Sequence, residues 1–220
     1  DEFLYIATQY CDDLREICEQ QELGVREKLA YLGIYARPES YEFSGNCAVV
    51  TDLGEVDISP LYPLGIALPS TTVDHISSLK LYSIHKVILI ENKTNYDEFL
   101  FSEMQPDELV LYHGGFLSPQ KRKFFQKLAC ALSPKTEVLF WADIDLGGFQ
   151  MFLHLQAIFP RLTPMRMGGT EVNKYKALGL SRSEKYLKRL ADCRSDTRYS
   201  IFEDATLYEP WSCKLSDFCK

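Results

Sequence analysis

The sequence predicts an α/β fold, with a parallel β-sheet flanked by helices. From residue 81 onward, short apolar runs alternate three times with segments of helical periodicity. Each run is dense in Val, Ile, Leu and aromatic residues, which is typical of strands buried on both faces. The first 80 residues mix helical segments with stretches broken by glycine and proline. We therefore expect an N-terminal α+β portion over residues 1–80 and an α/β domain over residues 81–220.

Helices and short strands are both expected in the N-terminal portion. Apolar residues recur at helical spacing near the start of the chain, and glycines and prolines punctuate residues 37–66. Asp52-Leu53-Gly54 is typical of a turn that joins two antiparallel strands. The expected helices are 4–20, 25–32 and 73–79, and the expected strand pair is 47–51 with 55–58.

The α/β domain is expected to consist of strand–helix repeats. The expected strands are 85–90, 109–112 and 138–142, and the helices that follow them are 96–104, 119–132 and 149–158. Parallel neighbours need crossover connections, and right-handed crossovers place helices on the faces of the sheet. The repeats therefore imply a parallel sheet covered on both faces. At least one further basic helix is expected over residues 171–192.

Composition and cysteine usage are those of a globular cytoplasmic protein. Apolar residues make up 46% of the chain and charged residues 25%, with no apolar run near the roughly 20 residues that span a bilayer. The start of the chain has neither a signal-peptide pattern nor an initiator Met, so we expect a fragment of a longer protein. The seven cysteines include no C-x-x-C pair, which favours reduced thiols in the cytoplasm.

Charge is distributed unevenly along the chain. Residues 1–110 contain 7 basic and 20 acidic residues, whereas residues 161–198 contain 10 basic and 4 acidic residues, within a net charge of −7. Such asymmetry is typical of a protein with one face for a polyanion, although a solvated basic helix explains the charge equally well. The candidate DNA-binding residues in this segment are Lys174, Lys176, Lys185 and Lys188.

Two of the apolar runs end in carboxylates. Glu91 follows the first run, and Asp143 and Asp145 follow the third. Because parallel strands present their carboxyl ends to one edge of a sheet, we expect the three side chains to meet there. Clustered carboxylates repel one another unless a cation lies among them, and hard oxygen ligands suit Mg²⁺ or Mn²⁺. The sequence therefore predicts a divalent-metal site.

Gly147 and Gly148 follow the aspartates and allow the chain to turn tightly into the next helix. The amides at the start of that helix could also hold a phosphate. From this pattern alone, an Asp helix cap beside a turn Asp explains Asp143 and Asp145 as well as a metal site does.

Residues 85–158 resemble a TOPRIM domain, the metal-binding fold of topoisomerases, primases and certain nucleases. The nearer resemblance is to the branch that contains the topoisomerase VI A subunit, and nearer still to the C-terminal domain of the Wadjet defence subunit JetD. Three motifs carry this resemblance: Ile90-Glu91-Asn92, Leu111-Tyr112-His113-Gly114-Gly115, and Trp141-Ala142-Asp143-Ile144-Asp145-Leu146-Gly147-Gly148-Phe149. The last looks like that family's Trp-x-Asp-x-Asp-x-x-Gly-Phe.

The resemblance implies a metal-dependent DNA endonuclease of a bacterial anti-plasmid or anti-phage defence system. Glu91, Asp143 and Asp145 would hold Mg²⁺ or Mn²⁺ and catalyse phosphodiester hydrolysis. The residues implied to support the metal or face the phosphate are Lys93, His113, Gly114, Gly115, Gly147 and Gly148. Double-stranded DNA, an SMC-type condensin-like complex and a second copy of the chain would be the partners. Residues 1–80 would include the end of a winged-helix-like domain.

Two other functions stay open on the sequence. A haloacid-dehalogenase-like phosphatase also has Asp-x-Asp after an apolar strand, but that family expects Thr or Val soon afterwards, and here Leu146 and two glycines follow. A non-cleaving, metal-stabilised DNA-binding or assembly module is the other alternative.

Overall fold

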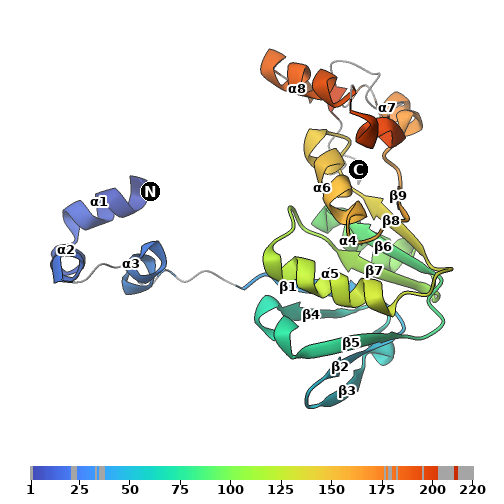
Figure 1. Ribbon diagram of the computed structural model, residues 1–220, viewed down its shortest axis with the longest axis horizontal. Helices are drawn as coiled ribbons and strands as arrows, with labels where there is room; N and C mark the ends of the chain where they lie inside the picture. Colours follow the sequence, from blue (N-terminus) through green and yellow to red (C-terminus); the bar gives the residue numbers. More distant parts are fainter. Residues whose placement is uncertain are drawn as a thin grey trace. The chain divides into compact units, whose positions relative to one another are not determined.

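The computed structural model is shown in Figure 1, and the chain divides into two compact units, Asp1–Glu39 and Ser40–Lys220. The residues that it describes are 2–20, 24–32, 34, 38–175, 177, 180–181, 183–194, 196–202 and 211–212. The division therefore differs from the domain boundary expected near residue 80. The physical reason is that residues 40–81 form strands that belong to the same unit as the rest of the sheet.

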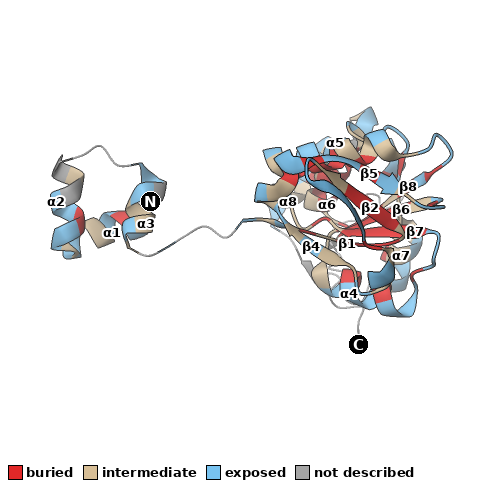
Figure 2. Ribbon diagram, turned by 90° about the horizontal axis from the view of Figure 1, so that it is seen from below, coloured by how far each residue is buried: buried red, intermediate tan, exposed pale blue. Residues whose placement is uncertain are grey.

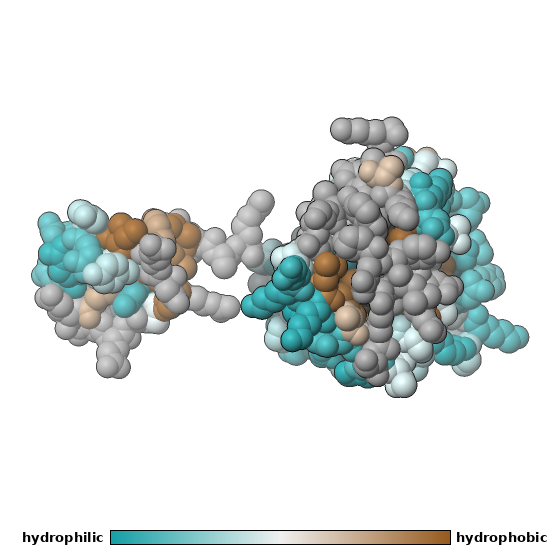
Figure 3. Space-filling view, turned by 90° about the horizontal axis from the view of Figure 1, so that it is seen from above, coloured by the Kyte–Doolittle hydropathy of each residue, from teal (hydrophilic) through white to brown (hydrophobic). Residues whose placement is uncertain are grey.

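The N-terminal unit contains three short helices. They are α1 (Glu2–Tyr10), α2 (Asp12–Gln20) and α3 (Val25–Tyr31). The single helix expected over 4–20 is thus interrupted at Cys11. Leu4 and Leu14 are buried in this unit, whereas Tyr5 and Tyr10 are exposed. Figure 3 shows hydrophobic side chains at the surface of this unit beside hydrophilic ones.

A six-stranded mixed sheet forms the centre of the second unit. In spatial order its strands are β4 (Ile66–Pro69), β1 (Ser40–Ser44), β7 (Glu108–Tyr112), β6 (Lys86–Ile90), β8 (Glu137–Trp141) and β9 (Leu162–Pro164). Strands β7, β6, β8 and β9 are parallel, which confirms the predicted parallel arrangement. The antiparallel strands β1 and β4, which the sequence analysis missed, extend it on one side. The fold is therefore α/β, with a mixed sheet in place of a wholly parallel one.

A smaller antiparallel sheet packs within the same unit. Its strands, in spatial order, are β3 (Gly54–Asp57), β2 (Cys47–Thr51) and β5 (Ile76–Leu81). The predicted pair of 47–51 with 55–58 is confirmed as β2 and β3. The helix predicted over 73–79 is wrong, because Ser70–His75 form a 3-10 helix and β5 follows. An irregularity in the pairing of β2 with β5 leaves Ile76 and Leu79 buried at a helix-like spacing.

Helices cover both faces of the large sheet. They are α4 (Lys93–Ser102), α5 (Pro119–Ala131) and α6 (Leu146–Gln156). Figure 2 shows α4 and α5 on opposite sides of the strands. On the α5 side, Phe140 of β8 is fully buried and packs against Phe152 of α6, while Trp141 faces Phe99 of α4. Phe140 and Trp141 are successive residues of β8, so they contact helices on opposite faces of the sheet, as the two-residue repeat of a strand requires.

The C-terminal part contacts α6 through the 3-10 helix η4 (Thr197–Phe202). It comprises α7 (Gly169–Tyr175), β10 (Leu180–Ser181), α8 (Glu184–Arg194), η4 and β11 (Trp211–Ser212). Phe202 stacks on Phe149 with ring centroids 4.5 Å apart and meets the edge of Phe152 at 4.9 Å. Among the described residues, no helix has the length and apolar character that crossing a membrane requires.

Phe140→Ala should destabilise the second unit by about 3–5 kcal/mol, since it empties the volume of a fully buried ring between β8 and the helices that pack on it. Denaturant unfolding measures this loss. Phe101→Ala is the matched control, because the Phe101 side chain on α4 is 67% exposed. Similar losses for both variants would contradict this description of the core.

Candidate functional site

The carboxyl ends of the central strands meet at one edge of the sheet. Ile90 is in register with Tyr112 of β7 and with Trp141 of β8. Beyond the paired residues, the Glu91 N–H donates to the Trp141 carbonyl at 2.8 Å, and the His113 N–H donates to the Ile90 carbonyl at 2.7 Å. The sheet ladder thus continues into the loops. Glu91 and the aspartates after β8 consequently start from the same edge, as expected.

Glu91 is electrostatically coupled to both aspartates. Its carboxyl group is partly buried, and this burial is the largest cause of a pKa raised to about 7. The negative charges of Asp143 and Asp145 raise the pKa further. Asp143 and Asp145 are partly exposed and flank Ile144, which is buried. The three carboxylates therefore act on one another at the end of β6 and β8.

The turn after β8 is closed by backbone and side-chain hydrogen bonds. The Asp145 N–H donates to the Asp143 carbonyl at 2.9 Å, and Asp145 Oδ1 accepts the Gly148 N–H at 2.9 Å as the N-cap of α6. A β-carbon on Gly148 would lie 2.1 Å from the Asp143 carbonyl oxygen, so only glycine fits there. Asp145 therefore caps α6, as the helix-cap alternative predicted. The hydrogen bond to Gly148 holds the Asp145 carboxylate at the N-terminus of that helix.

A tyrosine from the C-terminal part also binds this turn. The Leu146 N–H donates to the Tyr186 hydroxyl oxygen at 2.8 Å. Tyr186 lies on α8, 40 residues further along the chain. Tyr186 could not be identified from the sequence, because a tyrosine at helical spacing with Leu190 has the pattern of an ordinary core residue.

Lys93, two residues after Glu91 in the sequence, lies in an ion-pair network of its own. Its ammonium group contacts Glu42 on β1 at 2.6 Å and Asp97 on α4 at 2.8 Å. The same group lies 4.7 Å from the ring centre of Tyr96 and 5.4 Å from that of Tyr112. Two carboxylates outside the Glu91 cluster therefore engage the ammonium group that was expected to face a phosphate.

His113 lies in the aromatic core and does not face the sheet edge. Its side chain stacks on Phe125 and meets Phe140 edge-on, at centroid distances of 5.7 and 5.3 Å. Neither ring nitrogen has a hydrogen-bond partner among the described residues. Burial, with a smaller contribution from Lys121, lowers the pKa of His113 to about 3. His113 is therefore a neutral imidazole that packs in the core, and it does not have the expected position near a phosphate.

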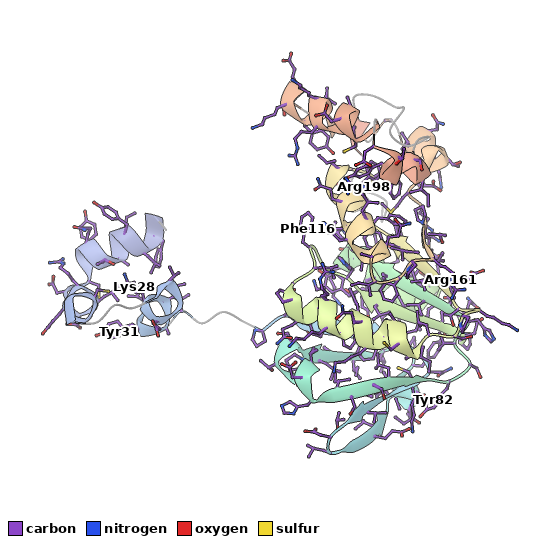
Figure 4. The ribbon with its side chains drawn as sticks, viewed as in Figure 1. Lys28, Tyr31, Tyr82, Phe116, Arg161 and Arg198 are labelled. Carbon is purple, nitrogen blue, oxygen red and sulfur yellow. The ribbon has the colours of Figure 1, made fainter. Side chains whose placement is uncertain are left out.

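Gly114 and Gly115 shape the loop after β7. Both have positive φ, 54° and 70°, and a β-carbon on Gly114 would lie 2.8 Å from the Tyr112 ring. The buried ammonium group of Lys121 donates to the Gly114 carbonyl at 2.7 Å. The Lys121 side chain thereby holds the loop in place. The loop also carries the exposed side chain of Phe116, labelled in Figure 4.

The segment after β9 is fixed against the end of β8. The Ala142 N–H lies 3.4 Å from Met167 Sδ, and the Arg166 guanidinium lies 4.6 Å from the centre of the Trp141 ring. Arg166 has φ 55° and donates two hydrogen bonds to Glu103 at the end of α4. These contacts support the backbone from which Asp143 projects.

The described lysines that were predicted to bind DNA lie on two surface helices. Lys174 is exposed on α7, and Lys185 and Lys188 are exposed on α8. Lys176 lies outside the described residues. The exposed Arg189 joins Lys185 and Lys188 on the outer side of α8, while Leu190 is buried.

The carboxylates suit a divalent cation that keeps much of its own hydration. Within the part of the chain that the structure describes, no group of three or more His, Cys, Asp or Glu side chains is arranged so that it could hold a metal ion by itself. Mg²⁺ is usually bound by one or two carboxylates together with waters and substrate phosphates. A cation would also relieve the repulsion that Glu91 experiences from Asp143 and Asp145.

A family model described as "Wadjet protein JetD, C-terminal" matches residues 50–208. The chain belongs to this family. The match extends from β2 to a point beyond η4, so it includes Glu91, the Asp143–Gly148 turn and α8. The resemblance to the C-terminal part of JetD is therefore confirmed. No curated protein matches the chain.

Glu91→Gln should stabilise the cation-free protein at neutral and alkaline pH. Because folding raises the pKa of this carboxyl group from 4.5 to about 7, wild-type stability falls as the pH rises through that interval. Glutamine has a similar shape and no charge, so the variant avoids this loss. We expect a gain of about 1–2 kcal/mol in unfolding free energy at about pH 8 and none at about pH 4, from denaturant titrations in chelator.

Glu137→Gln is the matched control, since Glu137 is exposed at the start of β8, the opposite end from Asp143. If wild type and Glu91→Gln have the same pH dependence, the three carboxylates do not interact as described.

Proposed function

We propose that this protein is a divalent-metal-dependent DNA endonuclease subunit of a Wadjet defence system. The observation that carries the proposal is the convergence of Glu91, Asp143 and Asp145 at one sheet edge, in a chain of the JetD C-terminal family. Membership of this family favours DNA cleavage over the phosphatase alternative, which rests on the Asp-x-Asp pattern alone.

Two of the three carboxylates have separate structural supports. Glu91 extends from β6 and is tied to β8 by its own amide, while Asp145 is fixed as the cap of α6. Mg²⁺ or Mn²⁺ bound there would supply Lewis-acid stabilisation of the phosphodiester transition state and an activated water. The protein's part is to position oxygen ligands on rigid strand ends, next to the N-terminus of α6, whose partial positive charge favours anions.

The basic C-terminal helices provide a surface for the DNA backbone. Lys174 on α7 and Lys185 and Lys188 on α8 are exposed, and the Tyr186 contact connects α8 to the turn that carries Asp143 and Asp145. Phosphate contacts from such lysines give affinity without sequence preference. We further propose double-stranded DNA as the substrate, an SMC-type complex as the partner, and a homodimer that cuts two strands.

Asp143→Ala should abolish DNA cleavage and leave the protein folded. The substitution removes an oxygen ligand, and it also relieves repulsion of Glu91 in the cation-free state. Nicking and linearisation of plasmid DNA in Mg²⁺ or Mn²⁺, measured with the natural protein and its partner complex, test this outcome. Denaturant unfolding of the same variant verifies that it is folded.

Asp107→Ala is the control, because Asp107 is exposed before β7, at the opposite edge of the sheet. Wild-type cleavage by Asp143→Ala would eliminate the proposed mechanism. A wild-type protein that binds DNA and Mn²⁺ without cutting would instead support the non-cleaving alternative.

Reversing Lys174, Lys185 and Lys188 to glutamate should weaken DNA binding by a similar factor for unrelated sequences. Each phosphate contact that is lost should reduce the slope of log K against log salt by about 0.9. Fluorescence anisotropy over a salt series measures both effects. Lys135→Glu is the control, since Lys135 is exposed in the loop between α5 and β8. An unchanged slope in the triple variant would identify these helices as an ordinary solvated surface.

A further inference from the structure

One N–H group in the first turn of α6 donates its hydrogen bond to a side chain of a distant helix. The first four N–H groups of an α-helix have no partner within the helix. In α6, Asp145 accepts the Gly148 N–H at 2.9 Å, and the Tyr186 hydroxyl accepts the Leu146 N–H at 2.8 Å. Leu146 directly follows Asp145. The tyrosine therefore binds the backbone of the same turn that presents the two aspartates.

The helix that carries Tyr186 has two distinct sides. Tyr186 is partly buried and Leu190, four residues later, is buried, so both face the interior. Lys185, Lys188 and Arg189 are exposed around Tyr186. The inner side thus contacts the carboxylate turn, while the outer side offers positive charge to a phosphate backbone.

Contacts beyond the tyrosine make α8 and α6 one packed assembly. Helix η4 contacts both α8 and α6. Its Phe202 stacks on Phe149, in the first turns of α6, and its Tyr199 interacts electrostatically with Cys193 of α8. A restraint applied to α8 therefore reaches the start of α6 through a short and well-packed route.

We infer that Tyr186 is a positioning residue that couples DNA binding on α8 to cation binding by Glu91, Asp143 and Asp145. Phosphates bound by Lys185 and Lys188 restrain α8 and, through the Tyr186 hydroxyl, the backbone between Asp145 and Leu146. A cation shared by the carboxylates restrains the same turn. Two ligands that order one element favour each other's binding, and the effect is equal in both directions. This inference rests on the proposed function.

A purely structural role for Tyr186 predicts a different result. A hydroxyl that merely caps α6 contributes about 0.5–1.5 kcal/mol to stability, and its loss lowers the unfolding temperature without altering how one ligand affects the other. The coupling between cation and DNA is consequently the quantity that separates the two roles.

The experiment measures the affinity for Mn²⁺ by electron paramagnetic resonance, with and without a short DNA duplex at low salt, in wild type and Tyr186→Phe. Phenylalanine retains the ring that packs in the interior and removes the hydroxyl. In wild type, DNA should strengthen Mn²⁺ binding by at least about fivefold, and Mn²⁺ should strengthen DNA binding by the same factor. In Tyr186→Phe, both factors should fall below their wild-type values, leaving only the direct attraction between the cation and a phosphate at the carboxylates.

Tyr62→Phe is the matched control, because it removes a partly buried hydroxyl that donates to the Met104 carbonyl at 3.0 Å and contacts neither α8 nor the carboxylate turn. It should retain the wild-type coupling. Equal coupling in wild type and Tyr186→Phe, or no coupling in wild type, overturns the inference. If Mn²⁺ binds and Asp143→Ala abolishes that binding, the proposed metal site stands even when the coupling is absent. Failure of wild type to bind Mn²⁺ overturns both.

Discussion

The register between β6 and β8 is the constraint on which the site depends. Ile90 pairs with Trp141, and the Glu91 N–H then binds the Trp141 carbonyl, so the chain leaves both strands at the same level. A slip of one residue would exchange the two faces of a strand, placing Phe140 where Trp141 now meets α4. The core therefore enforces the register, and the register brings Glu91 to Asp143. The packing of the core thereby holds the negative charges of Glu91 and Asp143 close together despite their repulsion.

The same turn satisfies two demands that compete for its side chains. Helix α6 needs acceptors for its first amides, and the carboxylate cluster needs oxygens directed at the sheet edge. Asp145 contributes to the first by capping Gly148, while Tyr186 supplies another acceptor from α8. Because Gly148 has no β-carbon, the chain can pass within close contact of the Asp143 carbonyl. A tyrosine far along the chain thus completes a turn whose glycines and aspartates are local.

Features that depend on strand polarity could be predicted from the sequence, whereas features that depend on distant partners could not. Apolar runs ending in acids are sufficient to place Glu91 and Asp143 at one edge. The alternation of Tyr41 and Phe43 with polar neighbours is a strand signal, yet the strand pairs with β7 through Phe43 and Leu111, which are far apart in the sequence. Similarly, nothing in the surroundings of Lys93 in the sequence indicates Glu42 as its partner, and a histidine before two glycines has no local mark of burial.

Charge distribution explains how an acidic chain could approach DNA. Glu42 and Asp97 engage Lys93, so the cation nearest the carboxylates in sequence is already paired. A phosphate near Glu91, Asp143 and Asp145 would meet repulsion that the partial charge of the α6 N-terminus offsets only in part. Lysines on α8 can attract the backbone, but they lie on the outer side of that helix. Under the proposed function, a divalent cation would offset this repulsion, and the metal would then contribute to substrate binding as well as to catalysis.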